Sequence, residues 1–146
     1  MIRTIKNINN DLETFCDNHL QIKEFGWGNI SNITTKDHDF VMLWLQPIGS
    51  IIEGNLLTLR YDMYIMDLVK QDNSNLEDVH NDTFLIGLDV VNKFWSDEET
   101  YGWTINENTV TSEPFEAKFD DYTLGHIFSI EIEVENRMSN CNIPEE

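Results

Sequence analysis

The chain has 146 residues, 40% of them hydrophobic, and its nine basic residues stand against 27 acidic ones, giving a formal net charge of −18. This length and composition suit one globular domain with a sizeable core, which argues against global disorder. A surface this acidic repels phosphate, so ordinary nucleic-acid binding is not expected.

The first predicted element is an amphipathic helix from about Arg3 to Lys23. Its apolar stripe recurs every three or four positions, at Ile5, Ile8, Leu12, Phe15, His19 and Ile22. Asn10 and Glu13 resemble a capping box, so a start at Asn10 is the alternative. Gly26 is expected to end the helix by taking the left-handed conformation. His19 is expected to be a hydrogen-bonded core histidine.

A strand hairpin is predicted next. The nearly continuous apolar run Phe40 to Gln46 indicates a strand covered on both faces, which Pro47 should end. Ile48 to Gly54 is then expected to form a long connecting loop. The adjacent Ile51 and Ile52 in that loop either form a partner surface or fold back on their own domain.

The second hairpin strand, Asn55 to Leu68, is the central element of the predicted fold. Alternation gives it one apolar face, made of Leu57, Leu59, Tyr61, Met63 and Ile65. A helix should cover that face. The opposite face mixes charged residues with Tyr64 and Met66, and it should meet solvent or a neighbouring subunit.

A second helix is predicted from Leu76 to Trp95, with Asn75 or Ser74 as its N-cap. One apolar stripe contains Leu76, Val79, Thr83, Ile86, Val90 and Phe94. A second stripe contains Phe84, Leu88, Val91 and Trp95. Together they cover roughly 200° of the helical wheel, whereas an ordinary surface helix needs about 100°. The extra width predicts a second partner, either the first helix, another subunit, or both.

The C-terminal part should add two strands. Trp103 to Glu116 is predicted as one irregular strand, and Pro114 places it at a sheet edge or bulge. Leu124 to Glu135 alternates most regularly. Glu131, Glu133 and Glu135 share one of its faces and cannot be buried together cheaply, so they should face water, a cavity or a basic partner.

The predicted fold class is α+β, with a mostly antiparallel sheet of about four strands and two helices packed on one face. The whole chain, residues 1–146, should form a single domain with a long β-hairpin. Residues 136–146 are predicted to be a flexible tail.

Motifs for catalysis are missing from the sequence. It has no nucleophile elbow, zinc-protease helix, phosphate-binding loop or dinucleotide fingerprint, so we expect no enzyme activity, no cofactor and no metal site. Cys16 and Cys141 have no metal-binding spacing and are expected to be reduced thiols, with Cys16 in the core. No segment approaches the roughly 20 apolar residues of a membrane span, which predicts a protein made and used in the cytoplasm or in something assembled there.

This succession of elements resembles the tail terminator and neck (head–tail connector) ring proteins of tailed bacteriophages. Three stretches of the sequence are also similar to virion structural proteins of crAss-like phages. They are FGWGNISNITTKDHDF, LRYDMYIMDLVKQDNSNLEDVHND and KFWSDEETYGW. The resemblance covers nearly the whole chain. It lies in the order of the elements and in these stretches of sequence, not in a catalytic motif.

The resemblance implies a virion protein, assembled in the host cytoplasm, that forms a ring of six or twelve copies. Such a ring joins portal, neck and tail proteins around a DNA channel, and the DNA passes through without being bound specifically. The implied subunit interface contains Ile48, Ile51, Ile52, Phe84, Leu88, Val91 and Trp95. Glu131, Glu133 and Glu135 would line the channel, where negative charge stops DNA from adhering.

Another class of function fits the acidic composition. An acidic DNA-mimic inhibitor would place its carboxylates in the basic cleft of a DNA-binding protein, as a monomer or dimer whose binding weakens with salt. The carboxylates of this chain are scattered through loops and strands instead of being concentrated in one run, which favours the ring. A small hydrolase with an unrecognised site is a third, minor interpretation.

Overall fold

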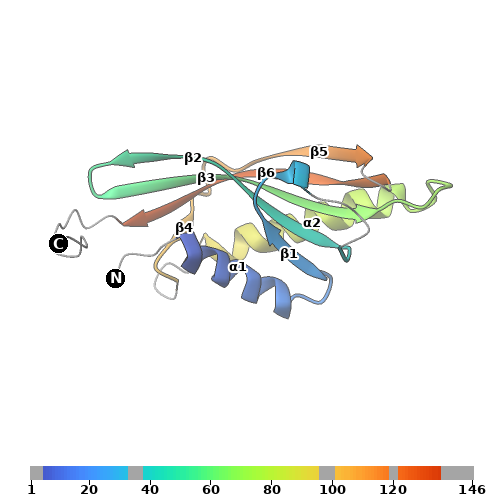
Figure 1. Cartoon of the computed structure of the whole chain (residues 1–146), viewed down its shortest axis with the longest axis horizontal. Helices are drawn as coiled ribbons and strands as arrows, with labels where there is room; N and C mark the ends of the chain where they lie inside the picture. Colours follow the sequence, from blue (N-terminus) through green and yellow to red (C-terminus); the bar gives the residue numbers. More distant parts are fainter. Residues whose placement is uncertain (1–4, 33–37, 96–100, 119–121, 136–146) are drawn as a thin grey trace.

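The computed structural model describes residues 5–32, 38–95, 101–118 and 122–135, which contain two α-helices, a short 3₁₀ turn and a six-stranded sheet (Figure 1). In chain order the elements are α1 (Ile5–Asn18), β1 (Glu24–Trp27), η1 (Ile30–Asn32), β2 (Met42–Glu53), β3 (Leu56–Leu68), α2 (Leu76–Phe94), β4 (Thr104–Ile105), β5 (Thr111–Lys118) and β6 (Tyr122–Glu135). The predicted tail, residues 136–146, lies outside the described residues.

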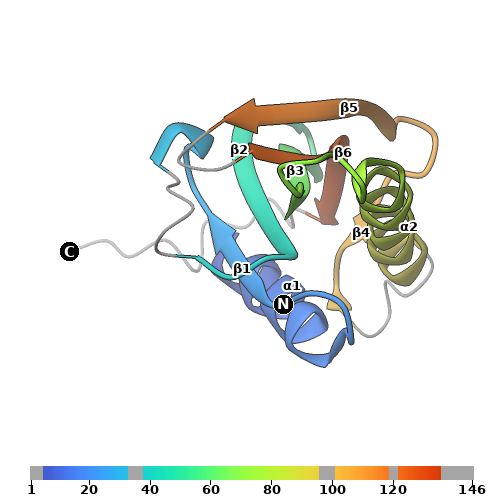
Figure 2. The same ribbon diagram turned by 90° about the vertical axis from the view of Figure 1, so that its right-hand side faces the viewer.

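The strands form a mixed, curled sheet in the order β1-β2-β3-β6 (Figure 2). β4 and β5 follow one another along the other edge of β6, so the predicted irregular strand is two strands on one edge, with Pro114 on that edge. β1 pairs with β2 in parallel, and the remaining pairs are antiparallel. The α+β class is confirmed. The mostly antiparallel sheet of about four strands is wrong, because β1 was not predicted as a strand and the outer edge was predicted as one strand instead of two.

Gly26 explains why β1 was missed. The first helix ends at Asn18, well before the predicted Lys23, and Gly26 lies inside β1 opposite Trp44. A Cβ atom on Gly26 would lie 2.4 Å from the Trp44 ring. The position therefore needs glycine because an aromatic ring crosses it, not because a helix ends there.

The hairpin is also different from its prediction. β2 does not stop at Pro47 but continues to Glu53, with a register shift between Pro47 and Gly49. Such a bulge accommodates a proline, which has no N–H for the ladder. The predicted loop from Ile48 to Gly54 is therefore mostly strand. The chain reverses at Gly54, whose φ of 58° is the left-handed conformation that a tight turn requires.

The main core lies between the two helices and one face of the sheet. The apolar face predicted for β3 is part of it: Tyr61, Met63 and Ile65 are buried there, with Leu57 and Leu59 packed against them. Helix α1 adds Ile8, Leu12 and Cys16 to the same cluster. Burial raises the pKa of the Cys16 thiol to about 12, with smaller contributions from the carboxylates of Asp17 and Glu13.

A smaller core covers part of the opposite face of the sheet. Met42, Trp44, Tyr64 and Met66 are buried there under Ile30, Phe40, Phe115 and Ile127. The rings of Tyr64 and Phe115 meet edge to face at 5.0 Å. The prediction that Tyr64 and Met66 meet solvent or another subunit is therefore wrong, because the sheet curls and brings β5 over them.

Helix α2 matches its prediction to within one residue. Its buried stripe packs so closely on β6 that a Cβ on Gly87 would lie 2.0 Å from the Phe128 ring. Asn75 precedes the helix without capping it. Its carboxamide instead accepts a hydrogen bond from the Lys70 N–H at 2.8 Å and donates to the Leu68 carbonyl at 3.2 Å, which fixes the turn between β3 and α2.

Candidate interaction surfaces

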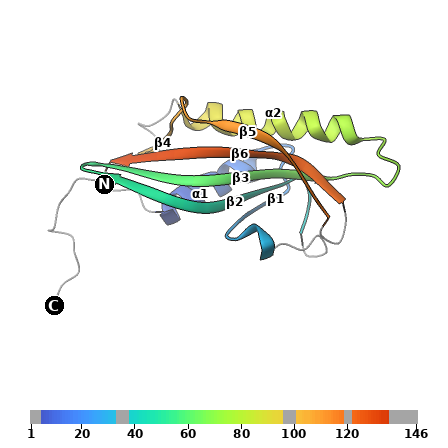
Figure 3. The ribbon, with the colours of Figure 1, turned by 90° about the horizontal axis from the view of Figure 1, so that it is seen from above.

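The β2–β3 hairpin projects beyond both helices at one end of the molecule (Figure 3). Ile48, Ile51 and Ile52 lie on this projection, with exposed fractions of 49%, 42% and 70%. They stand on paired strands and not in a loop. Exposure at these levels rules out the alternative that Ile51 and Ile52 fold back on their own domain.

The two adjacent isoleucines point to opposite faces of the hairpin. The register places Ile52 opposite Leu57, which lies opposite Val134, on the helix side of the sheet. Ile51 lies opposite Thr58 and belongs to the other side. The tip is therefore apolar on both faces. A large exposed β-branched residue on each face is typical of a surface that a partner covers.

The projection is also poor in charge. Of residues 47–59 only Glu53 is charged, although charged residues make up 25% of the chain. In the described part of the chain, β1 pairs only with residues 42–45 of β2, so the rest of that edge has no neighbouring strand. Depletion of charge together with exposed apolar side chains is the composition of an interface core.

The second predicted stripe of α2 is only partly exposed. Val91 is buried and Leu88 is half-buried, whereas Phe84 and Trp95 are 37% and 44% exposed. The Phe84 ring packs on the rings of His126 and Phe128, at centroid distances of 5.4 and 5.9 Å. Only the two ends of this stripe are therefore available to a second subunit.

The three predicted acidic residues lie on the face of β6 away from the helices, as their alternation predicts. Glu131 and Glu133 are half-buried, and Glu135 is exposed. One carboxylate oxygen of Glu133 accepts a hydrogen bond from the Asn106 carboxamide at 2.9 Å. Arg60 lies directly opposite Glu131 on β3, and Ile48 lines the same shallow hollow of about 270 Å³. The structure thus brings one predicted interface residue next to the acidic strand.

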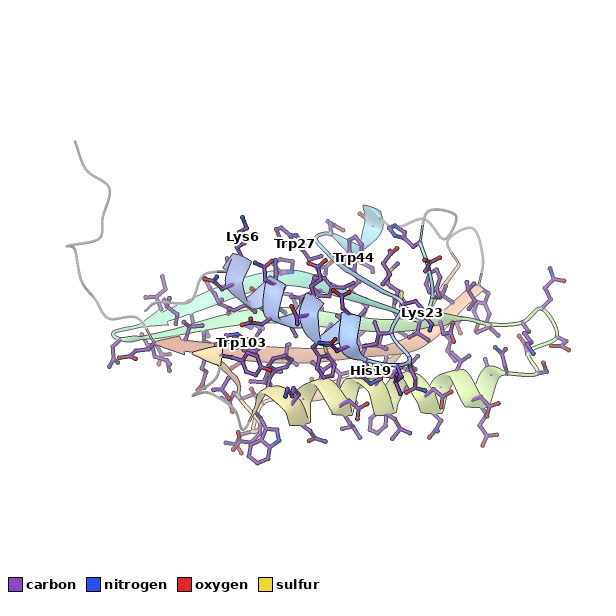
Figure 4. The ribbon with its side chains drawn as sticks, turned by 90° about the horizontal axis from the view of Figure 1, so that it is seen from below. Lys6, His19, Lys23, Trp27, Trp44 and Trp103 are labelled. Atoms are coloured by element: carbon purple, nitrogen blue, oxygen red, sulfur yellow. The ribbon has the colours of Figure 1, made fainter. Side chains whose placement is uncertain are left out.

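A groove between α1 and β1 was not predicted. It encloses about 510 Å³ and its lining includes Ile5, Lys6, Asn9, Glu13, Phe25 and Trp27. Ile5 and Trp27 are 48% and 53% exposed. Figure 4 shows Trp27 beside α1, and Lys6 at the N-terminal end of that helix. The glycines around Trp27 hide the strand pattern of β1, so the sequence gives no sign that a strand lies beside α1.

Asn9 is the one buried side chain whose polar atom is left unsatisfied in the described residues. It is 8% exposed, and its Oδ1 atom has no hydrogen-bond partner. A buried acceptor without a donor costs about 1–3 kcal/mol. Asn9 also lines the α1–β1 groove, although its Oδ1 atom has almost no accessible surface of its own.

A cleft of about 360 Å³ lies between the C-terminal parts of α1 and α2. His19 Nε2 lies 2.8 Å from Asp89 Oδ2, and its Nδ1 accepts a hydrogen bond from the Gln21 N–H at 3.2 Å. The Trp103 indole donates to Asp11 Oδ2 at 2.8 Å. Both imidazole nitrogens are thus occupied, which makes His19 a bridge between the helices. The prediction of a hydrogen-bonded histidine is confirmed, although His19 lies at the edge of the core.

Within the described ranges, no three histidine, cysteine, aspartate or glutamate side chains are grouped closely enough to hold a metal ion. None of the helices placed by the structure is long and apolar enough to cross a membrane. No protein-family model matches the sequence, and the search of curated proteins finds no similar protein.

Proposed function

We propose that this chain is a non-enzymatic structural protein that assembles with copies of itself into a ring. In this proposal the ring belongs to the neck or tail of a phage particle, as tail terminator or head–tail connector, and joins portal and tail proteins around the DNA channel. The phage assignment rests on the sequence resemblance, and self-association rests on the projecting hairpin.

The hairpin is the observation that carries self-association. It extends apolar side chains on both faces past the helices, and its edge beyond residue 45 of β2 has no strand neighbour in the described part of the chain. Water-exposed isoleucines on an open strand edge are an aggregation hazard that soluble proteins normally protect with charge. Here Glu53 is the only charge, so the proposal is that a neighbouring copy covers the tip.

The acidic strand has a role consistent with a channel. Glu131, Glu133 and Glu135 lie on the opposite side of the sheet from both helices, and Asp62 lies near them, bound to the Ser129 hydroxyl at 2.9 Å. A ring that turned this face inward would repel DNA phosphates and let DNA pass without specific binding. A ring that turned it outward would leave this part of the proposal without support.

The test of self-association compares wild type with Ile52→Glu by sedimentation velocity and light scattering. Ile52 is 70% exposed, so the substitution should leave the fold unchanged, while a charge in a buried contact should weaken assembly at least about tenfold. Gln71→Glu adds the same charge in the exposed turn before α2 and serves as the matched control. A wild-type chain that stays monomeric, alone and with portal protein, would overturn the proposal.

The DNA-mimic inhibitor is the competing proposal, supported by the net charge of −18 and by the acidic face of β6. It predicts a complex with a basic DNA-binding protein that weakens as salt is added. It gives no role to the exposed isoleucines of the hairpin. Ile52→Glu would leave such a complex unchanged, which separates the two proposals.

A further inference from the structure

The α1–β1 groove is an apolar recess with an unsatisfied acceptor in its wall. Trp27 and Ile5 line it with about half of their surface exposed, and the buried Oδ1 atom of Asn9 has no hydrogen-bond donor among the described residues. An occupant with apolar side chains and an N–H group would cover Trp27 and Ile5 and give Asn9 a donor. The described residues of a single copy supply neither.

The charge of the chain restricts what can occupy the groove. A second copy also carries a formal charge of −18, so most of its surface would be repelled by the acidic surface of the first copy. The lining residues include one basic side chain, Lys6, and one acidic side chain, Glu13. A suitable occupant is therefore apolar and nearly uncharged, with a carboxylate placed to meet Lys6.

We propose that the tip of the β2–β3 hairpin of one copy docks in the α1–β1 groove of the next copy. The tip carries a single charge between residues 47 and 59, and this carboxylate, Glu53, follows directly after the exposed Ile52. Ile52 enters beside Trp27, and Glu53 meets Lys6. Because the Asn9 Oδ1 atom is itself buried, the Asn9 side chain rotates on docking and accepts a hydrogen bond from the exposed carboxamide of Asn55 at the turn.

Contact between two different surfaces of one chain is heterologous, and it closes into a ring when the rotation between neighbours is a simple fraction of a full turn. The inference rests on the proposed self-assembly and identifies the surfaces that make it. It differs from a symmetric dimer, in which two hairpin edges would pair with each other and leave the groove empty.

The experiment uses disulfide crosslinking between copies. In a Cys141→Ser background, one protein carries Glu53→Cys and a second carries Lys6→Cys, and the two are mixed under mild oxidation. Cys16 does not interfere, because it is 2% exposed and buried in the core. We expect covalent heterodimers. Leu20→Cys replaces Lys6→Cys in the control, because Leu20 is 91% exposed but lies past the far end of α1.

Charge exchange gives a second measurement that does not depend on cysteine chemistry. Lys6→Glu should weaken association about fivefold or more, and adding Glu53→Lys should restore it. Wild-type assembly without the Glu53–Lys6 crosslink, and with association unchanged by Lys6→Glu, would overturn the groove contact while leaving the ring intact. Crosslinks formed equally with Leu20→Cys would also overturn it. A wild type that never assembles would instead refute the proposed function.

Discussion

Asn9 shows how one side chain can cost stability in an isolated copy. Its carboxamide lies on the buried stripe of α1 beside Ile8 and Leu12, yet its Oδ1 atom has no partner in the part of the chain described. An apolar side chain of similar size would pack there without that penalty. Proteins retain such groups when function requires them and stability permits it.

Asn9→Leu should therefore stabilise the monomer by about 1 kcal/mol, because it removes an unsatisfied buried acceptor. The melting temperature should rise by a few degrees, measured by calorimetry at a concentration where the protein does not associate. Association should weaken at the same time, because the groove loses its acceptor. Asn18→Leu, at the exposed C-terminal end of α1 and outside the groove, is the control and should change neither quantity much. A destabilised Asn9→Leu variant would contradict this account.

His126 is a buried titratable residue on β6. Burial, and secondly the neighbouring His80, lower its pKa below the ordinary value. The two imidazole rings lie 4.4 Å apart, and the Thr83 hydroxyl lies 3.3 Å from His126 Nδ1. The folded state therefore disfavours the protonated ring that the unfolded chain accepts near pH 6.5.

The unfolded chain thus binds more protons than the folded chain in this range, so the contribution of His126 to stability is complete above about pH 6.5 and decreases as pH falls towards the lowered folded pKa. His126→Phe should lose less unfolding free energy than wild type between pH 7.5 and 5, measured by urea denaturation. His80→Gln removes one cause of the shift and should give an intermediate slope. Identical slopes for all three proteins would contradict the assignment.

Contact between elements depends on single glycines as much as on apolar stripes. Gly87 lets α2 approach β6 until the Phe128 ring fills the space where a side chain would begin. Phe128 is 1% exposed and packs beside Phe84, so it has little freedom to move. α2 and β6 are therefore held at a distance that the methyl group of an alanine at position 87 would increase.

Gly87→Ala should destabilise the fold by about 1–3 kcal/mol, because overpacking exceeds the roughly 1 kcal/mol that alanine gains over glycine in a helix. Chemical denaturation measures the change. Gly87→Ala with Phe128→Leu should recover part of the loss by reopening the space. If Gly87→Ala were as stable as wild type, the close approach of α2 would not be a feature of the folded protein.

The elements that could be predicted from the sequence are those with a long uninterrupted period. β3, β6 and α2 repeat their apolar pattern over many residues, and the face of each that packs into the main core was predicted correctly, as were the outward glutamates of β6. β1 has four residues and contains Gly26, so it lacks a readable period. β2 continues past Pro47 only because a bulge accommodates the proline, and that depends on its pairing with β3.

The interaction surfaces also divide into one that could be predicted from the sequence and one that could not. The exposed isoleucines could be predicted because two adjacent apolar residues near glycines are visible in the sequence. The α1–β1 groove could not be predicted, because it exists only where two elements of different type lie side by side. Its most informative residue, Asn9, resembles any polar residue of a helix until its surroundings are known.

At the scale of the whole molecule, net charge opposes the proposed assembly. Each copy carries a formal charge of −18, and bringing copies together concentrates that charge. Apolar contact at the hairpin is non-directional and does not depend on the sign of charge. Assembly should therefore be a balance between long-range repulsion and short-range burial of apolar side chains. Added salt weakens the repulsion, so it should favour assembly.

Raising NaCl from about 0.05 M to about 0.5 M shortens the screening length from roughly 14 Å to roughly 4 Å and should strengthen self-association, because like charges on neighbouring copies are then hidden from one another. Sedimentation velocity at fixed protein concentration measures the change. Ile52→Glu distinguishes specific assembly from general salting-out, since it should remain dissociated throughout. Association that weakens with salt would require attraction between opposite charges to outweigh the repulsion. A single Lys6–Glu53 pair cannot do this between copies that each carry a formal charge of −18, so that result would point to a basic partner instead.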